Sequence, residues 1–480
     1  MPSETIFDVA IIGAGPGGYA TALRAAKAGL NVLLVEKKDA GGVCLNEGCI
    51  PSKIWLHWGH LFDEVSQATK LGILGDGRNA FNFAALQKYR ESKVSALRNG
   101  IEGLENANGV TYIKGTARIA SASGSTKQIQ VGNDYYTCKT LIIATGAKPR
   151  VLPFAKDAYD GVHVMSFEQV FFLNELPGTL GVIGGGAIGL ELADFFASLG
   201  VNVHVLEAQP SVLMMEDAEV RTVLTKALRA KGIEITTGAK ASGIQVSEYG
   251  GNCRVLYESQ GENHTLVVDK VLLAIGIVPH TGDLGLEEAG IETDQGGFIK
   301  VDPVTYETNV LGVYAIGDVA RGRFAHEAEA HGERVIEMIL HPGEYPRIDP
   351  RFVPGCVFTN PQVASFGFKE DEARTARSGH DIRVGKARYE QIGRGIAFGD
   401  KGFVKIVVDY CCLGGEVLGA HIVGPSAEYL VQILSVALAQ EANLSSLKKA
   451  ILIHPTLPEA LKEAVADVEG NALHALPKKK

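Results

Sequence analysis

The sequence lacks a long hydrophobic run. No apolar stretch approaches the roughly 18 residues that cross a membrane, and no basic stretch followed by an apolar one opens the chain. We therefore expect a soluble, cytoplasmic protein without a membrane span. Basic residues are fewer than acidic ones, 46 Lys and Arg against 55 Asp and Glu, which gives a net charge of −9. No overall positive field exists to attract nucleic acid, so nucleic acid is not an expected partner.

Cysteine is scarce and odd in number. Seven cysteines among 480 residues do not make the disulfide framework of a secreted protein, so a pair with a role should be catalytic or metal-binding. Proline is not in excess, at 18 residues, whereas glycine is, at 57. That is about 12% of the chain, against roughly 7% in ordinary proteins. A surplus of glycine without a surplus of proline argues against collagen and against disorder. It predicts sites where the backbone turns tightly or approaches a phosphate.

A strand, a glycine-rich turn and a helix open the sequence. The apolar run 6–12 ends at 13–18, Gly-Ala-Gly-Pro-Gly-Gly; a helical pattern follows to Gly29, and 31–36 is typical of a second buried strand. Such a βαβ unit is typical of dinucleotide binding. The glycines let backbone N–H groups and the helix dipole meet a pyrophosphate, and the acid that ends the second strand, Glu36, accepts hydrogen bonds from a ribose.

The same unit recurs later in the chain. Residues 180–183 lead into 184–189, Gly-Gly-Gly-Ala-Ile-Gly, then into a helix to Gly200 and a strand ending at Glu207. The distance from the first motif glycine to the terminal glutamate is the same in both copies, 13 to 36 and 184 to 207. One such motif is weak, but two in register predict two dinucleotide sites. No Lys or Arg stands between Glu207 and Val220, so the second site should prefer NAD to NADP.

Further strand signals organise the rest of the chain. Two apolar strands that end at Gly146 and Gly276 each precede a proline-containing turn and indicate crossings between domains. A third ends at Asp318, which either binds the hydroxylated part of a long dinucleotide or only closes a turn. The last 130 or so residues contain alternating segments such as 403–409 and an apolar helix near 427–440, which predict an α+β module.

Cys44 and Cys49 lie directly after the first unit. In an ideal helix, residues five apart have Cα atoms roughly 8 to 9 Å apart, beyond the about 7 Å that a disulfide spans. A disulfide therefore needs a distorted turn, for which Gly48 gives the freedom. The spacing alone leaves open a redox pair and two buried thiols, and it makes metal ligation less favoured because no further Cys or His stands close by.

Two other groups have competing interpretations. Cys411 and Cys412 fall beside two glycines in a predicted hairpin turn and are interpreted as structural. Thr456 and Glu459 have the spacing of a capping box that opens a helix, which the residues alone favour. The adjacent His454 is nevertheless a base suited to generating a thiolate near neutral pH.

In combination these motifs resemble the pyridine nucleotide-disulfide oxidoreductases, and within them most closely the branch that oxidises dihydrolipoamide. The resemblance covers nearly the whole chain, from Asp8 to about Val465. It implies an α/β fold with two Rossmann-like dinucleotide-binding domains and a C-terminal α+β dimerisation domain. The implied domains are 1–149, the first part of an FAD-binding domain with the redox disulfide; 150–280, an NAD-binding domain; 281–346, a central domain that completes the FAD site; and 347–480, an interface domain.

The resemblance also implies two cofactors, one non-covalent FAD per subunit and NAD+/NADH, and no metal. The FAD site is implied to comprise Gly13, Gly15, Gly18, Glu36, Lys53, Ala117, Thr145, Gly146, Asp318, Ala325 and His326. The NAD site is implied to comprise Gly184, Gly186, Gly189, Glu191, Glu207 and Gly276.

Six residues are implied to be catalytic: Cys44, Cys49, Lys53, Glu191, His454 and Glu459. By the resemblance, Cys44 forms the mixed disulfide with substrate and Cys49 lies against the flavin. Lys53 and Glu191 form an ion pair beside the flavin ring. His454, oriented by Glu459, reaches the disulfide of the other subunit.

The implied function is oxidation of protein-bound dihydrolipoamide to lipoamide with reduction of NAD+ to NADH, by a homodimer. Its implied partners are a lipoyl domain or carrier protein and the acyltransferase core of a 2-oxo acid dehydrogenase complex; a glycine cleavage system is a second setting. Glu47 stands where the family often has an apolar residue, and Leu452 where it often has a second histidine. Two rivals stay open: a reductase of another low-molecular-weight disulfide or of mercuric ion, and a non-catalytic flavoprotein subunit.

Overall fold

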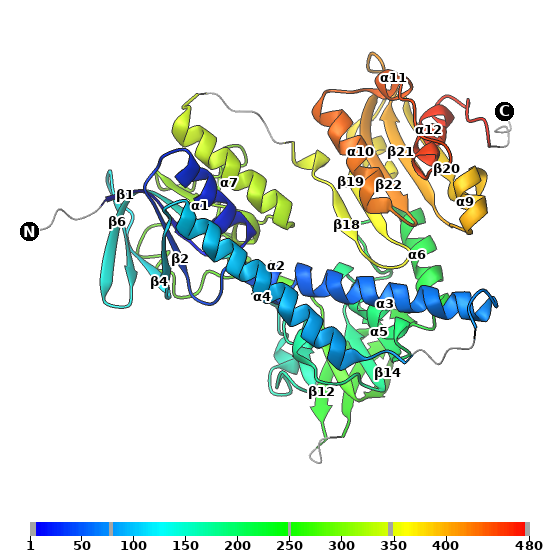
Figure 1. Cartoon of the computed structure of the whole chain (residues 1–480), viewed down its shortest axis with the longest axis horizontal. Helices are drawn as coiled ribbons and strands as arrows, with labels where there is room; N and C mark the ends of the chain where they lie inside the picture. Colours follow the sequence, from blue (N-terminus) through cyan, green and yellow to red (C-terminus); the bar gives the residue numbers. More distant parts are fainter. Residues whose placement is uncertain (1–5, 76–79, 248–250, 344–348, 476–480) are drawn as a thin grey trace, which may run out of the picture. The chain divides into compact units, whose positions relative to one another are not determined.

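The computed structural model describes residues 6–75, 80–247, 251–343 and 349–475 (Figure 1). The chain divides into two compact units, each assembled from several parts of the sequence. The first unit takes residues 1–55, 82–175 and 275–348, and the second takes 56–81, 176–274 and 349–480. Within the described residues, none of the helices is both long enough and apolar enough to cross a membrane.

The first unit is built on a sheet that contains the first predicted βαβ segment. Parallel strands run in the order β3-β2-β1-β6, β17 pairs in parallel with β6, and β5 and β4 extend the sheet in antiparallel pairing. The elements of this unit are β1 (Ile6–Ile12), α1 (Pro16–Lys27), β2 (Val32–Glu36), α2 (Gly42–Glu47), α4 (Phe83–Ala107), β3 (Thr111–Lys114), β4 (Ala117–Ser121), β5 (Lys127–Val131), β6 (Asp134–Ile143), β7 (Ala147–Pro149), β8 (Val164–Ser166), β16 (Ile277–Pro279), β17 (Val313–Ala315) and α7 (Ala325–Leu340). Helix α3 (Cys49–Lys70) begins in this unit and continues into the second.

The parallel strands of this unit are buried on both faces. Such strands need a continuous apolar sequence rather than an alternating one, and residues 32–35 of β2 are at most 1% exposed. Helices α1 and α7 pack together so closely that a Cβ on Gly332 would lie 1.7 Å from the Thr21 hydroxyl oxygen. This packing fixes the N-terminus of α1 at the carboxyl end of β1.

The second unit contains the second predicted βαβ segment and the C-terminal module. Parallel strands run in the order β11-β10-β9-β15, and β12, β13 and β14 form an antiparallel sheet. The elements of this unit are β9 (Thr179–Ile183), α5 (Ala187–Ser198), β10 (Asn202–Glu207), α6 (Ala218–Ala230), β11 (Glu234–Thr237), β12 (Lys240–Val246), β13 (Cys253–Ser259), β14 (Glu262–Val268), β15 (Lys270–Leu273), β18 (Gly355–Val357), β19 (Val363–Gly367), α8 (Glu370–Ala376), β20 (Ile382–Arg388), α9 (Gly393–Phe398), β21 (Phe403–Asp409), β22 (Glu416–Val423), α10 (Ala427–Ala439), α11 (Leu444–Leu447) and α12 (Pro458–Asp467).

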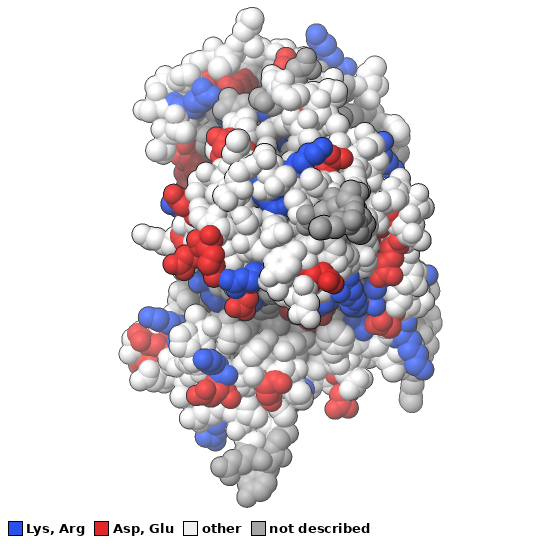
Figure 2. All heavy atoms as spheres, turned by 90° about the vertical axis from the view of Figure 1, so that its left-hand side faces the viewer, with Lys and Arg blue, Asp and Glu red and all other residues white. Residues whose placement is uncertain are grey.

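The C-terminal module is a five-stranded antiparallel sheet, β18-β19-β22-β21-β20, with helices α10 and α12 packed on one face. The predicted α+β character is confirmed, and α10 coincides with the apolar helix expected near 427–440. Both βαβ segments also have the predicted strand and helix positions. The chain therefore has the predicted α/β fold, with one βαβ segment in each of two sheets. On the face drawn in Figure 2, acidic and basic side chains are interspersed rather than gathered by sign.

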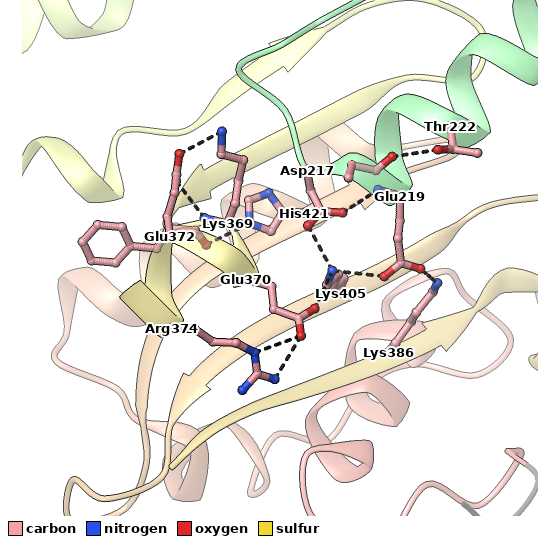
Figure 3. A network of polar contacts seen from close by, with 12 residues as sticks. Asp217, Glu219, Thr222, Lys369, Glu370, Glu372, Arg374, Lys386, Lys405 and His421 are labelled. Carbon is pink, nitrogen blue, oxygen red and sulfur yellow. Dashed lines mark hydrogen bonds and ion pairs between the residues drawn. The ribbon is translucent and has the colours of Figure 1, made fainter. Parts of the chain in front are cut away.

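A buried lysine connects α6 and α8 with the C-terminal sheet (Figure 3). Lys405, on β21, is 2% exposed, and three carboxylate groups each approach its ammonium nitrogen to 3.0 Å: Asp217, Glu219 and Glu370. Burial acts to raise the pKa of Asp217, but the hydrogen bond and the charge of Lys405 outweigh it and hold that pKa below its ordinary value. The stabilisation from Asp217 is therefore present above the unfolded pKa of about 4 and is lost as the pH falls through the folded pKa.

We expect Lys405→Met to lower the free energy of unfolding by about 3 to 5 kcal/mol at neutral pH, because it leaves a buried carboxylate without a counterion. Protonation of Asp217 removes that charge, so the stabilities of wild type and variant should converge below about pH 4. Denaturant unfolding across this pH range measures both curves. The matched control is Lys386→Met, whose more exposed ammonium also pairs with Glu219 and should cost at most about 1 kcal/mol. Curves that stay parallel would contradict the electrostatic account.

Candidate cofactor and redox site

The first glycine-rich turn lies between β1 and α1. Gly13 has φ of +101°, and a Cβ there would lie 2.4 Å from the carbonyl oxygen of Ala144. A Cβ on Gly18 would lie 1.8 Å from the Gly13 carbonyl oxygen, an approach that only glycine allows. Gly15, the N-cap of α1, differs, because a Cβ there would meet nothing within 4 Å. The turn is tight on its inner side and open at the helix N-terminus.

The second glycine-rich turn, between β9 and α5, repeats this geometry. Gly184 has φ of +113°, and a Cβ on Gly189 would lie 2.1 Å from the Gly184 carbonyl oxygen. Gly186 is the N-cap of α5, and a Cβ there would again meet nothing within 4 Å. The internal repeat seen in the sequence is therefore a repeat of backbone geometry.

The glutamates that end the second strands also occupy equivalent positions. Glu36 accepts the N–H of Ala14 at 2.7 Å, and Glu207 accepts the N–H of Gly185 at 2.6 Å. The other oxygen of each carboxylate accepts the N–H two residues further along the chain, at 2.8 and 2.7 Å. Each carboxylate is thus fixed beside its glycine turn and keeps further lone pairs for a ribose hydroxyl.

The arrangement of strands and polar groups fits a bound dinucleotide. In the first sheet β1 has β2 on one side and β6 on the other, and in the second β9 has β10 and β15. Ligands of open α/β sheets bind at such points, beyond the carboxyl ends of the strands. Thr145, which follows β6, has a buried hydroxyl oxygen without a hydrogen-bond partner in the described part of the chain. A buried hydroxyl is costly to leave unpaired, so the residues of the first unit fit a ligand with polar groups here.

The predicted redox pair lies at a break between two helices. Helix α2 ends at Glu47 and α3 begins at Cys49, and a Cβ on the intervening Gly48 would lie 3.0 Å from the Val43 carbonyl oxygen. The distorted turn that a disulfide between these cysteines would need is present at Gly48. Its consequence is that the thiols of Cys44 and Cys49 lie in hydrogen-bond contact.

The start of α2 is seated on the first glycine-rich turn. Gly42 has φ of +57°, and a Cβ there would lie 2.7 Å from the Cα atom of Gly15. The N–H of Gly41 donates to the Ala14 carbonyl oxygen at 2.8 Å. The thiol pair is therefore fixed to the same backbone turn whose open side fits a dinucleotide.

The thiol of Cys44 is affected by both burial and nearby charge. The hydrogen bond with the Cys49 thiol, burial and the charge of Cys49 together raise the pKa of Cys44, and the backbone N–H of Cys49 and the positive charge of Lys53 offset this only in part. Cys44 is half-buried, whereas Cys49 is exposed. The surroundings of Cys44 therefore favour its protonated form.

Glu47 stands between the two cysteines, where the family often has an apolar residue. It has an ion-pair partner that the sequence did not reveal. Its carboxylate lies 3.3 Å from the ammonium of Lys38. Opposite charges nine residues apart across a loop carry no periodic signal, so only the structure could show this pair. Because Lys38 is largely exposed, the pair moderates rather than cancels the negative charge beside the thiols.

His454 and Glu459 come together at the start of α12. The imidazole Nδ1 lies 2.8 Å from one oxygen of Glu459, and the other oxygen accepts the N–H of Thr456 at 2.9 Å. Partial burial acts to raise the pKa of Glu459, but these hydrogen bonds outweigh it and lower the pKa below its ordinary value. The two interpretations of this segment are therefore compatible: Glu459 makes one bond of a capping box and also orients His454. The His454 side chain is 73% exposed and can reach a molecule outside the chain.

The other predicted FAD residues lie on three further segments of the first unit. Ala117 begins β4, Asp318 lies in the 3-10 turn after β17, and Ala325 and His326 open α7. Burial and the charge of Glu327 raise the pKa of Asp318 to about 6. Gly146, after Thr145, has φ of +67°.

The structure gives the positions of three more predicted residues. The ion pair between Lys53 and Glu191, and the place of Gly276 in the NAD site, stay predictions. Lys53 lies on α3, one turn after Cys49, in the first unit. Glu191 lies on α5 in the second unit, where it accepts the N–H of Phe358 at 2.9 Å. Gly276, with φ of +95°, belongs to the first unit, whereas the rest of the predicted NAD site belongs to the second.

Comparison with known protein families gives two matches. Residues 7–332 match the family described as pyridine nucleotide-disulphide oxidoreductase, and residues 353–465 match the dimerisation domain of the same family. Together these matches include both glycine-rich turns, the cysteine pair and the His454–Glu459 pair.

Curated relatives match over nearly their whole length. Dihydrolipoyl dehydrogenase from Thermus scotoductus is 37% identical over 475 residues, which cover 98% of this chain and 99% of the relative. The Bacillus subtilis dihydrolipoyl dehydrogenase is 36% identical over 477 residues, with 99% and 98% coverage.

Solved structures are also similar. LpdA from Mycobacterium tuberculosis has a TM-score of 0.87 at 27% identity and covers 96% of this chain and 100% of its own. The flavoprotein disulfide reductase RclA from Escherichia coli, solved as a Cu(II) complex, has a TM-score of 0.83 at 28% identity, with 97% and 100% coverage.

Proposed function

Because this chain belongs to the pyridine nucleotide-disulphide oxidoreductases, we propose that it oxidises protein-bound dihydrolipoamide to lipoamide and reduces NAD+ to NADH. It is an oxidoreductase of a family that uses FAD and NAD(H) and carries a dimerisation domain. The observation that supports the proposal most is the thiol pair, seated through Gly42 on the glycine turn that opens α1. We assign FAD to the first unit, with the residues predicted from the sequence, and NAD to the turn that opens α5.

The chemistry begins at the disulfide form of the pair. His454 of the partner subunit accepts the proton of one substrate thiol, held in the correct tautomer by its bond to Glu459. The substrate thiolate attacks the Cys44 sulfur, the Cys44–Cys49 bond breaks, and Cys49 leaves as a thiolate. The second substrate thiol then attacks the sulfur bound to Cys44 and gives its proton to the released Cys44 sulfur, so lipoamide closes, Cys44 becomes a thiol and the first proton stays on His454 of the partner subunit.

The surroundings of the two thiols suit this order of reaction steps. We assign the negative charge of the reduced pair to Cys49, the leaving thiol, which fits the hydrogen bond with Cys49 and the burial that raise the pKa of Cys44. FAD, when bound, carries the two electrons of the dithiol on to NAD+.

The lipoyl-bearing protein and the acyltransferase core of a 2-oxo acid dehydrogenase complex are the partners that this activity requires. The similarity to RclA supports a second candidate function, that of a flavoprotein reductase of another disulfide. Steady-state assays with dihydrolipoamide and NAD+, and with oxidised glutathione and NADH, separate the two. The proposal expects NADH formation from dihydrolipoamide; turnover of glutathione disulfide without it would overturn the proposal.

We expect a marked preference for NAD+ over NADP+. The carboxylate of Glu207 is fixed beside the second glycine turn, and no Lys or Arg follows it before Val220. A 2′-phosphate would meet a like charge that costs several kcal/mol, so kcat/KM should favour NAD+ by at least about 100-fold. Glu207→Gln should narrow this ratio, while the matching change Glu234→Gln, at an exposed carboxylate of the same sheet, should leave it unchanged. Equal use of both coenzymes would contradict the assignment of Glu207.

A further inference from the structure

The second cysteine pair lies in a hydrogen-bonded turn of the C-terminal sheet. Strands β21 and β22 are antiparallel and are joined by residues 410–415, which include Cys411 and Cys412. Gly414 and Gly415 have φ of +82° and +77°, conformations that favour glycine. The N–H of Tyr410 also donates to the Asp381 carbonyl oxygen at 2.9 Å. The turn is therefore fixed both internally and to the loop before β20.

Three different metal-binding groups converge beside this turn. Ligand atoms of His380, Asp409 and Cys411 all lie within 4.8 Å of one another. The Asp409 carboxylate is fully buried, and one of its oxygens lies 2.7 Å from His380 Nδ1. His380 and Cys411 are exposed, so the group is open to solvent on one side. One nitrogen, one oxygen and one sulfur ligand are the donor set that Zn2+ and similar divalent ions accept.

Hydrogen bonds from the backbone support these ligands. The N–H of Asp381 donates to the Cys411 sulfur at 3.0 Å, and the N–H of Cys411 donates to the second oxygen of Asp409 at 3.1 Å. Such supporting bonds orient the ligands of protein metal sites.

The neighbouring Cys412 has different surroundings. Its sulfur lies 3.6 Å from an oxygen of Glu416, and it forms a second convergent group with Glu416 and Asp409. Cys412 thus belongs to a different group from His380 and Cys411. The carboxylates add negative charge that attracts a cation, while Cys411 is the thiol available as a ligand.

We propose that His380, Asp409 and Cys411 form a binding site for one thiophilic divalent cation of the Zn2+ type, with the fourth tetrahedral position open to solvent. The sequence alone assigned this cysteine pair a structural role and implied no metal. The site is independent of the Cys44–Cys49 pair, so it does not rest on the proposed catalytic function.

Zn2+ binding to the full-length, FAD-loaded protein tests the proposal. Cys44 and Cys49 are both replaced by serine, so that the redox thiols cannot bind the metal, and the remaining thiols are kept reduced. Equilibrium dialysis with metal analysis gives the Zn2+ content per subunit, and Co2+ added in place of Zn2+ reports a sulfur ligand and tetrahedral geometry through its absorbance. We expect one Zn2+ per subunit and a sulfur-to-cobalt absorption band.

Three variants form a matched set: two change the exposed ligands His380 and Cys411, and one changes the neighbouring Cys412. His380→Gln and Cys411→Ser should each weaken Zn2+ binding by at least about tenfold, and Cys411→Ser should also remove the sulfur-to-cobalt band. Cys412→Ser should retain both the affinity and the band. The thermal midpoint without metal shows whether each variant is folded, and added Zn2+ should raise it only where the site is intact. Unchanged affinity in His380→Gln and Cys411→Ser, loss in Cys412→Ser alone, or no bound Zn2+ in the parent would overturn the proposal.

Discussion

Cys44→Ser enzyme is expected to lose dihydrolipoamide oxidation by at least about 10⁴-fold in kcat/KM, because serine offers no sulfur for the substrate thiolate to attack. The pair can then form no disulfide, so electrons from the substrate cannot reach the flavin. Reduction of the bound flavin by NADH should be retained, because that route does not pass through the thiols. The two measurements are steady-state lipoamide turnover and anaerobic stopped-flow reduction by NADH.

The matched control is Cys356→Ser, a half-buried cysteine of the C-terminal sheet, which should keep lipoamide turnover near that of wild type. Cys49→Ser should lose turnover as Cys44→Ser does, because each thiol needs the other to form the disulfide. Lipoamide turnover within tenfold of wild type in Cys44→Ser would contradict the assignment. Loss of NADH-driven reduction as well would show instead that the substitution disturbs the glycine turn on which α2 is seated.

His454→Gln is expected to lower kcat/KM for dihydrolipoamide by about 10² to 10⁴-fold, the usual contribution of a positioned base. The loss should shrink as the pH rises toward the pKa of a free thiol, about 8.5, because the substrate then ionises without help. Glu459→Gln should produce a smaller loss, since it removes the group that orients the imidazole but leaves the base in place. A pH profile of His454→Gln that runs parallel to wild type would contradict the role of this histidine.

A hybrid dimer shows which subunit supplies the base. One subunit carries Cys44→Ser and the other His454→Gln, so that neither homodimer is active. If His454 acts on the partner subunit's disulfide, one site of the hybrid contains both defects and the other contains none. The hybrid should then regain about half of the wild-type activity. A hybrid as inactive as the two parent homodimers would place the base in the same subunit as its disulfide.

The local signals of the sequence predicted the two nucleotide turns well, because their constraints are local. Gly13 and Gly184 need positive φ, and Gly18 and Gly189 need contact with the carbonyl oxygen of the first glycine, so residue type reports geometry directly. The break at Gly48 is predictable for the same reason. The hydrogen bonds that fix Glu36 to its turn were not, since they depend on the distance between two strands.

Strand β21 shows where local signals fail. The alternation of residues 403–409 is typical of a strand with one face in solvent, yet every residue of β21 is buried. One face packs with α10 and α12, and the other carries Lys405 against the carboxylates of α6 and α8. Asp217, the partner of Lys405, stands 188 positions earlier in the chain. No pattern within a strand reveals a counterion that distant.

Anaerobic reduction of the FAD-loaded enzyme tests the central claim most directly. One equivalent of dihydrolipoamide, or of NADH, should reduce the Cys44–Cys49 disulfide, and the proposed scheme assigns the resulting thiolate to Cys49. The account predicts a long-wavelength absorbance from this thiolate beside the flavin, which both reductants produce and Cys49→Ser abolishes. Reduction that bleaches the flavin without this absorbance and leaves the two cysteines unreactive toward a thiol reagent would contradict the account.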